Sequence, residues 1–241
     1  MPLNDLHNRI AANVAEVRQR IDHAAVKSGR KGTDVRLTAV SKYVQAGDAV
    51  IDALTAAGCS DLGESRPQVL LEKYLYYCTR DNCMPIRWHL IGTLQRNKVR
   101  KILPAVCLIH SLDSVKLAEA VHRIAEEEHL PPVHCLLETF ISRDADKRGI
   151  APESVLQTLD QIGSYPNIVI DGLMGMSGLQ SEAKEIHREF ALLRTTAEHA
   201  RQRGLPPNVR LSELSMGMSG DFEIAVEEGA TIVRIGSFLY Q

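Results

Sequence analysis

The sequence has few aromatic residues, almost no net charge and no long apolar run. Only 5% of its 241 residues are aromatic, and the formal net charge is −2. Such a small charge gives no general attraction to nucleic acid or to anionic lipid, and no apolar stretch approaches the ~20 residues that span a bilayer. The first ten residues are polar and lack the apolar core of a signal peptide. We therefore expect a cytoplasmic protein that binds neither nucleic acid nor membrane.

Several chemical signatures are also missing. The five cysteines are an odd number and include no Cys-x-x-Cys pair, and Cys78 and Cys83 are the only close pair. Because the number is odd and no signal peptide is recognised, we expect reduced thiols. We also expect no metal site, because no second ligand pair lies near Cys78 and Cys83. The sequence has no Gly-x-Gly-x-x-Gly turn after a strand, no Walker-type loop and no His-Glu-x-x-His. Dinucleotide, nucleoside triphosphate and zinc-protease chemistry are thereby disfavoured.

Hydrophobic residues make up 44% of the chain, and their spacing alternates between strand-length runs and helical periodicity. The pattern predicts strands near residues 36–41, 60–63, 87–92, 106–112, 133–140, 169–174, 211–216 and 231–237. It predicts helices near residues 3–29, 46–57, 66–78, 95–103, 114–129, 152–163, 181–203 and 221–228. Strict alternation implies parallel strands with right-handed crossovers. Eight such strands fit a single α/β domain over residues 1–241, a (β/α)8 TIM barrel with an extra N-terminal helix.

In this architecture the loops after the strands carry function. Lys42 ends the first predicted strand, where desolvation in the barrel mouth would favour a neutral amine that forms a Schiff base with an aldehyde. A lysine that simply extends into solvent is the alternative.

The loops after the last two predicted strands are rich in small residues. Gly217-Met-Ser219-Gly220 precedes Asp221, a candidate helix N-cap, and Gly236-Ser237 closes the last strand. Successive backbone N–H groups in such turns form a nest for an anion, and these two loops are the usual phosphate site of the fold. Glycine also suits any tight turn, so the structural alternative stays open.

Arg234 lies inside the last apolar strand and is expected to face the barrel interior. A buried guanidinium needs an acceptor. Glu64 or Asp61 would supply it in a structural ion pair, and a ring nitrogen or acid group would supply it in a ligand site. A lysine for an aldehyde, a nest for a phosphate and an arginine for a ring nitrogen together describe pyridoxal 5′-phosphate (PLP).

Motifs covering residues 36–237 occur in a fixed order. They include Ala39-Val-Ser-Lys42, Leu62-Gly-Glu64, Trp88-His-Leu-Ile-Gly92-x-Leu-Gln95-x-Asn97-Lys98, Leu214-Ser-Met-Gly-Met-Ser219-x-Asp221 and Val233-Arg-Ile-Gly236. On these motifs the sequence resembles the YggS/PROSC family of pyridoxal phosphate homeostasis proteins, which are related in fold to the barrel domain of alanine racemase.

The resemblance implies that Lys42 carries the Schiff base and that Arg234 faces the pyridine nitrogen. It places the phosphate on Ser219 with Gly236 and Ser237. The implied cofactor-binding residues are Lys42, His89, Gly92, Met216, Ser219, Arg234, Gly236 and Ser237. No catalytic residue is assigned.

The resemblance favours a PLP carrier over an enzyme. An arginine opposite the ring nitrogen disfavours the pyridinium form, which weakens PLP as an electron sink. A racemase also needs an acid/base group on the opposite ligand face; in alanine racemase a tyrosine of a further domain supplies it, and this chain ends directly after its last predicted strand. We expect PLP homeostasis without robust catalysis, with a PLP-dependent racemase or related low-activity enzyme as the alternative. The expected partners are PLP, other phosphorylated B6 vitamers and, transiently, PLP-dependent apoenzymes. The expected oligomeric state is a monomer or a weak dimer.

Two positions remain open. Lys147 lies in a polar loop after the fifth predicted strand and is either a second functional lysine or a solvated surface residue. Ser65 stands where the family usually has asparagine, which is expected to change a hydrogen bond near the cofactor or near its lysine.

Overall fold

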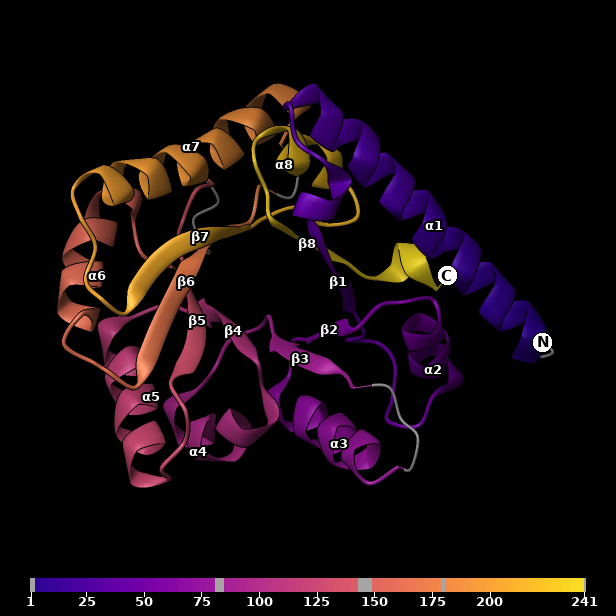
Figure 1. Ribbon diagram of the computed structural model, residues 1–241, viewed down its shortest axis with the longest axis horizontal. Helices are drawn as coiled ribbons and strands as arrows, with labels where there is room; N and C mark the ends of the chain where they lie inside the picture. The colour runs from indigo at the N-terminus through magenta and orange to yellow at the C-terminus, as the bar shows by residue number, and fades with distance from the viewer. Residues whose placement is uncertain (1–2, 81–84, 143–148, 179–180, 241) are drawn as a thin grey trace.

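A computed structural model describes residues 3–80, 85–142, 149–178 and 181–240 (Figure 1). Cys83 and Lys147 therefore lie outside the described residues. Eight strands, each hydrogen-bonded in parallel to its neighbours, form a closed barrel in chain order. They are β1 (Arg36–Val40), β2 (Asp61–Glu64), β3 (Arg87–Leu90), β4 (Leu108–Leu112), β5 (Val133–Glu138), β6 (Ile168–Met174), β7 (Val209–Ser215) and β8 (Ile232–Ile235). The predicted (β/α)8 barrel is confirmed.

Helices surround the barrel and lie between successive strands, as Figure 1 shows. The α-helices are α1 (Leu3–Lys27), α2 (Ala49–Ala56), α3 (Pro67–Cys78), α4 (Val99–Ile102), α5 (Val115–Glu127), α6 (Val155–Ile162), α7 (Ala183–Gln202) and α8 (Phe222–Glu227). The helix predicted at 95–103 is instead a short α4 between two 3-10 turns. Pro104 has no N–H to continue the helical hydrogen bonds, which explains why α4 stops.

The outer faces of the strands and the inner faces of the helices share one core. In α5, Leu117, Val121 and Ile124 recur at helical spacing and are all buried against the barrel. Ser114 begins this helix by accepting a hydrogen bond from the backbone N–H of Leu117 at 3.3 Å. A second, smaller apolar cluster comes from four strands and consists of Leu108, Leu136, Met174 and Ile232.

The N-terminal helix α1 covers the side of the barrel next to β8, where Figure 1 shows it running past α8 and the C-terminal turn. Arg20 pairs with Glu223 of α8 at 2.7 Å, and Asn13 donates to the carbonyl of Leu239 at 3.2 Å. This helix thus takes the place that a helix after β8 would fill, as its position in the sequence predicted. Within the described ranges, no helix is both long and apolar enough to cross a membrane.

Candidate functional site

Lys42 lies in the turn after β1, which ends at Val40. Its side chain is exposed, and its Nζ lies 5.1 Å from the centre of the Tyr43 ring. With Tyr43, Arg66 and Glu72 it lines a surface cavity of about 500 Å³. The expectation that burial would activate this amine is therefore wrong, because the strand stops before Lys42 and the side chain enters solvent. The amine is accessible from solvent through this cavity.

The backbone that carries Lys42 is held by a buried ion pair. Lys73 of α3 donates to Glu64 Oε2 at 2.5 Å, to the Ser41 carbonyl at 2.7 Å and to the Ser41 hydroxyl at 3.1 Å. Both charged side chains are 0% exposed, and burial lowers the pKa of Lys73 although Glu64 opposes the shift. Lys73 was not among the residues predicted from sequence. It fixes the residue directly before Lys42.

The turn after β2 is fixed by the same carboxylate. Glu64 Oε1 accepts the backbone N–H groups of Ser65 at 2.8 Å and Arg66 at 3.2 Å. A Cβ placed on Gly92 would lie 2.2 Å from the Ser65 carbonyl oxygen, so only glycine allows this approach of the turns after β2 and β3. The structure thus gives Gly92 a backbone role, and its contact with a cofactor stays a prediction.

The loop after β7 has a fixed shape. Asp221 accepts the backbone N–H of Met218 at 2.6 Å and makes a short hydrogen bond with the hydroxyl of Ser177. Asp221 occupies the N-cap position of α8, as predicted, but its side chain does not cap the helix because both oxygens bind these other groups. Gly217 has φ +92°, and a Cβ there would lie 2.6 Å from the Ala225 Cβ.

Replacement of Gly217 by alanine is expected to lower the free energy of unfolding by about 1–3 kcal/mol, through the strained φ and the contact with Ala225. Urea unfolding measures the loss. Gly220→Ala is the matched control in the same loop, because its φ is not in the strained region and a Cβ there meets nothing within 4 Å. Equal losses in the two variants would contradict the assignment of strain to Gly217.

The predicted phosphate residues lie close together at the ends of β7 and β8. Ser219, Gly236 and Ser237 are half-buried, and the backbone N–H of Arg234 donates to the Gly217 carbonyl at 2.9 Å, which joins the two loops to one another. A 3-10 helix begins at Ser237, and α8 begins just after Asp221. The backbone N–H groups of Asp221 and Phe222 already donate to the Met218 carbonyl, at 3.1 and 2.9 Å, so the binding of a phosphate by these loops stays a prediction.

Arg234 faces the interior of the barrel and is 5% exposed. Its Nη1 donates to Ser215 Oγ at 2.6 Å and its Nη2 donates to the Gly175 carbonyl at 3.1 Å. Burial lowers its pKa to about 10, so the guanidinium is still charged at neutral pH. The ion pair considered from sequence is wrong, because Glu64 pairs with Lys73 and Asp61 pairs with Arg87.

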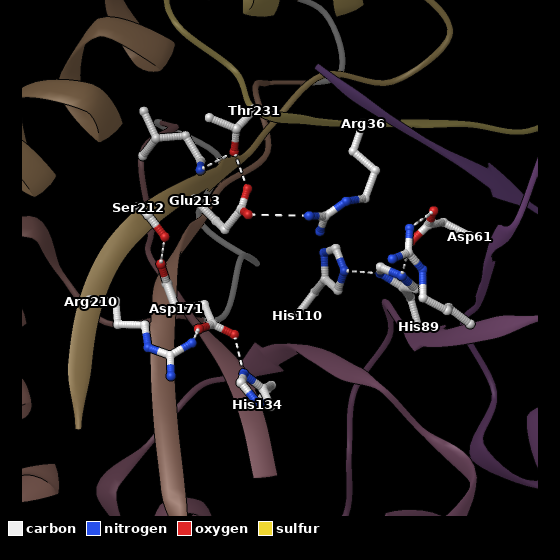
Figure 2. Close-up of polar contacts among 12 residues, drawn as sticks. Arg36, Asp61, His89, His110, His134, Asp171, Arg210, Ser212, Glu213 and Thr231 are labelled. Atoms are coloured by element: carbon white, nitrogen blue, oxygen red, sulfur yellow. Dashed lines mark hydrogen bonds and ion pairs between the residues drawn. The ribbon is translucent and has the colours of Figure 1, made fainter. Parts of the chain in front are cut away.

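His89 and Met216 lie away from Lys42. The ring of His89 is 1% exposed and is hydrogen-bonded to Asp61 and His110, each at 2.9 Å. Figure 2 shows these three side chains together. Met216 is fully buried in the main core. The structure thus brings together the predicted phosphate residues of the loops after β7 and β8. The side chains of His89 and Met216 are buried elsewhere among other partners. Their contact with a ligand stays a prediction.

These features define a class of protein: a single (β/α)8 barrel with a lysine after β1, loops rich in glycine and serine after β7 and β8, and a buried arginine on β8. The family described as "Alanine racemase, N-terminal domain" matches residues 7–241. The protein named "Pyridoxal phosphate homeostasis protein" of Pseudomonas aeruginosa is 38% identical over 233 residues, which are 96% of this chain and 94% of that protein. Its counterpart in Aquifex aeolicus is 34% identical over 94% of this chain and 95% of that protein. The chain belongs to the alanine racemase N-terminal domain family, among the pyridoxal phosphate homeostasis proteins.

Solved structures of other proteins share this fold. PipY of Synechococcus elongatus with PLP bound is 35% identical, covers 96% of this chain and 100% of its own, and superposes with a TM-score of 0.81. An alanine racemase of Clostridium difficile is 13% identical with a TM-score of 0.72, and the match covers 55% of that enzyme, so it bears on the fold alone.

Proposed function

We propose that this protein binds PLP in support of cellular PLP homeostasis, holding it as a Schiff base on Lys42 without robust catalysis of its own. The observation that carries the proposal is the grouping of Arg234 with the loops after β7 and β8, next to the turn that presents Lys42. The family's PLP-named relatives and the PLP bound to PipY support the choice of ligand. PLP supplies an aldehyde, which condenses with a primary amine and releases water.

The residues present fit this group. Ser219, Gly236 and Ser237 would hold the phosphate, and Arg234 would donate to the ring nitrogen. A guanidinium carries five N–H donors, and protein hydrogen bonds use two of those of Arg234 in the described part of the chain. Thr38 lies in register with Arg234 and has a buried hydroxyl without a hydrogen-bond partner among the described residues. A polar ligand above Arg234 would satisfy it.

The charge of Arg234 supports a carrier over an enzyme. A guanidinium with a pKa of about 10 keeps its protons at neutral pH. Opposite the ring nitrogen it would donate a hydrogen bond and disfavour protonation of that nitrogen, which weakens the carbanion chemistry of PLP enzymes. Other phosphorylated B6 vitamers would use the same phosphate loops, and competition with PLP would detect them.

The test uses the purified full chain with added PLP. We expect a visible absorbance band that borohydride bleaches, and peptide mapping that places the pyridoxyl group on Lys42. Lys42→Ala should lose the band, whereas Lys101→Ala, a change of an exposed lysine of α4, should keep it. A pyridoxyl group on another lysine, or a Lys42→Ala protein with the parent spectrum, would overturn the assignment.

Solvent deuterium exchange separates the carrier from the racemase alternative. The loaded protein is incubated with alanine or serine in deuterated water, and the α-carbon is followed by NMR. The carrier predicts no stereospecific exchange beyond that of free PLP. Exchange that is stereospecific and lost in Lys42→Ala would establish an enzyme. Pull-down with PLP-dependent apoenzymes tests transient partners separately.

A further inference from the structure

A continuous chain of hydrogen bonds crosses the barrel interior from β2 to β8. Asp61 Oδ1 bonds His89 Nε2 at 2.9 Å, His89 Nδ1 bonds His110 Nε2 at 2.9 Å, and His110 Nδ1 bonds Ser215 Oγ at 2.9 Å. Ser215 Oγ then accepts from Arg234 Nη1 at 2.6 Å. None of the five residues is more than 5% exposed. Figure 2 shows the part of the chain from Asp61 to His110.

With neutral rings, the two ends of the chain fix the position of every proton. Asp61 is an ionised carboxylate with a pKa of about 2, so it accepts from His89 Nε2. His89 Nδ1 must then accept from His110 Nε2, and His110 Nδ1 must accept from the Ser215 hydroxyl. Ser215 has given its only hydrogen to His110, so its oxygen can accept from Arg234, which is solely a donor.

The surroundings keep both rings neutral. Burial lowers the pKa of His89 and lowers that of His110 well below its ordinary value. The charges of Arg36 and Arg87 also lower the pKa of His89, whereas Asp61 raises it. The charges of Arg234 and Arg36 likewise lower the pKa of His110. Arg36 is held by Glu213 at 3.3 Å, and Arg87 is held by Asp61 at 2.5 Å.

We propose that Asp61, His89, His110 and Ser215 are positioning residues that aim Arg234 at the ring nitrogen of bound PLP. Ser215 holds Nη1 and the Gly175 carbonyl holds Nη2, so the plane of the guanidinium is fixed. Because the Ser215 hydrogen is held by His110 Nδ1, the orientation of the Ser215 hydroxyl is fixed while its oxygen accepts from Arg234. The inference rests on the proposed function, because it requires PLP at the mouth of the barrel.

The proton positions are tested first, without PLP. Nitrogen-15 NMR of histidine-labelled protein at neutral pH, assigned with His89→Gln and His110→Gln, should show both rings as neutral Nε2–H tautomers. An Nδ1–H tautomer or an imidazolium at either position would overturn the chain as assigned. This measurement does not depend on where, or whether, PLP binds.

The positioning role is then tested with Ser215→Ala, which removes the acceptor of Arg234. We expect PLP to bind about tenfold more weakly, because a charge-assisted hydrogen bond is lost. We also expect the absorbance band of bound PLP to shift and its pH titration to move. Ser212→Ala is the control on the same strand, since Ser212 is exposed and its hydroxyl donates to the Asp171 carbonyl at 3.4 Å.

Further variants test whether the hydroxyl of Ser215 is what positions Arg234. Ser215→Thr keeps the hydroxyl and should restore the parent spectrum, and His110→Gln gives a second break in the chain if Ser215→Ala does not fold. If Ser215→Ala and His110→Gln both fold and both keep the parent spectrum and the parent affinity for PLP, the positioning role is wrong. Retention of the PLP band by Lys42→Ala would instead refute the proposed function, and the tautomer measurement would still stand.

Discussion

Lys73→Met is expected to lower the free energy of unfolding by about 3–5 kcal/mol. The change removes the ammonium but keeps a side chain of similar length, so it leaves Glu64 as an uncompensated charge that is 0% exposed. The carbonyl and the hydroxyl of Ser41 lose their donor at the same time. Urea unfolding followed by circular dichroism measures the loss. Lys42 follows Ser41 directly, so PLP uptake should fall in the same variant.

Two further variants test whether the loss of stability comes from the unpaired charge of Glu64. Lys73→Met with Glu64→Gln should recover a large part of it, because the amide oxygen still accepts from Ser65 and Arg66 and no buried charge remains. Lys27→Met breaks an exposed pair with Glu227 and should leave stability nearly unchanged. A double variant no more stable than the single one would contradict the electrostatic origin.

The barrel could be predicted because its signals are local. Unbroken apolar runs mark buried parallel strands, and the runs between them repeat at helical spacing. All eight strands lie within a few residues of the predicted ranges. The error at 95–103 has a local cause in Pro104, and the predicted burial of Lys42 failed because β1 stops at Val40.

The partners of the interior polar groups could not be predicted, because barrel closure sets them. His110 and Ser215 are 105 residues apart in the chain and meet only across the barrel. Lys73 reads as one polar residue of an amphipathic helix, and only the fold directs it at Glu64 and Ser41. Inward-pointing histidines within apolar strands, such as His89 and His110, were the one available signal of the buried chain, since such residues need partners.

The two buried histidines predict that the free energy of unfolding falls as the pH drops below about 6.5. The unfolded chain binds a proton at each histidine near that pH, whereas the native pKa values of His89 and His110 lie lower. The unfolded state therefore binds more protons, and stability is lost as the pH falls from about 6.5 toward the native values. The slope should approach ~1.4 kcal/mol per pH unit for each ring, or ~2.7 for the pair.

Urea unfolding over a series of pH values measures this slope. Asp61 contributes in a lower window, because its pKa falls from 3.8 to about 2 on folding, so its share is lost only below about pH 4. His110→Gln should remove about half of the slope between about pH 6 and 5, and His23→Gln, a change of an exposed residue of α1, should leave it intact. If His110→Gln keeps the parent slope, His110 already carries its proton in the native protein and donates from Nδ1 to Ser215 Oγ, so the direction assigned to the His110–Ser215 hydrogen bond is wrong.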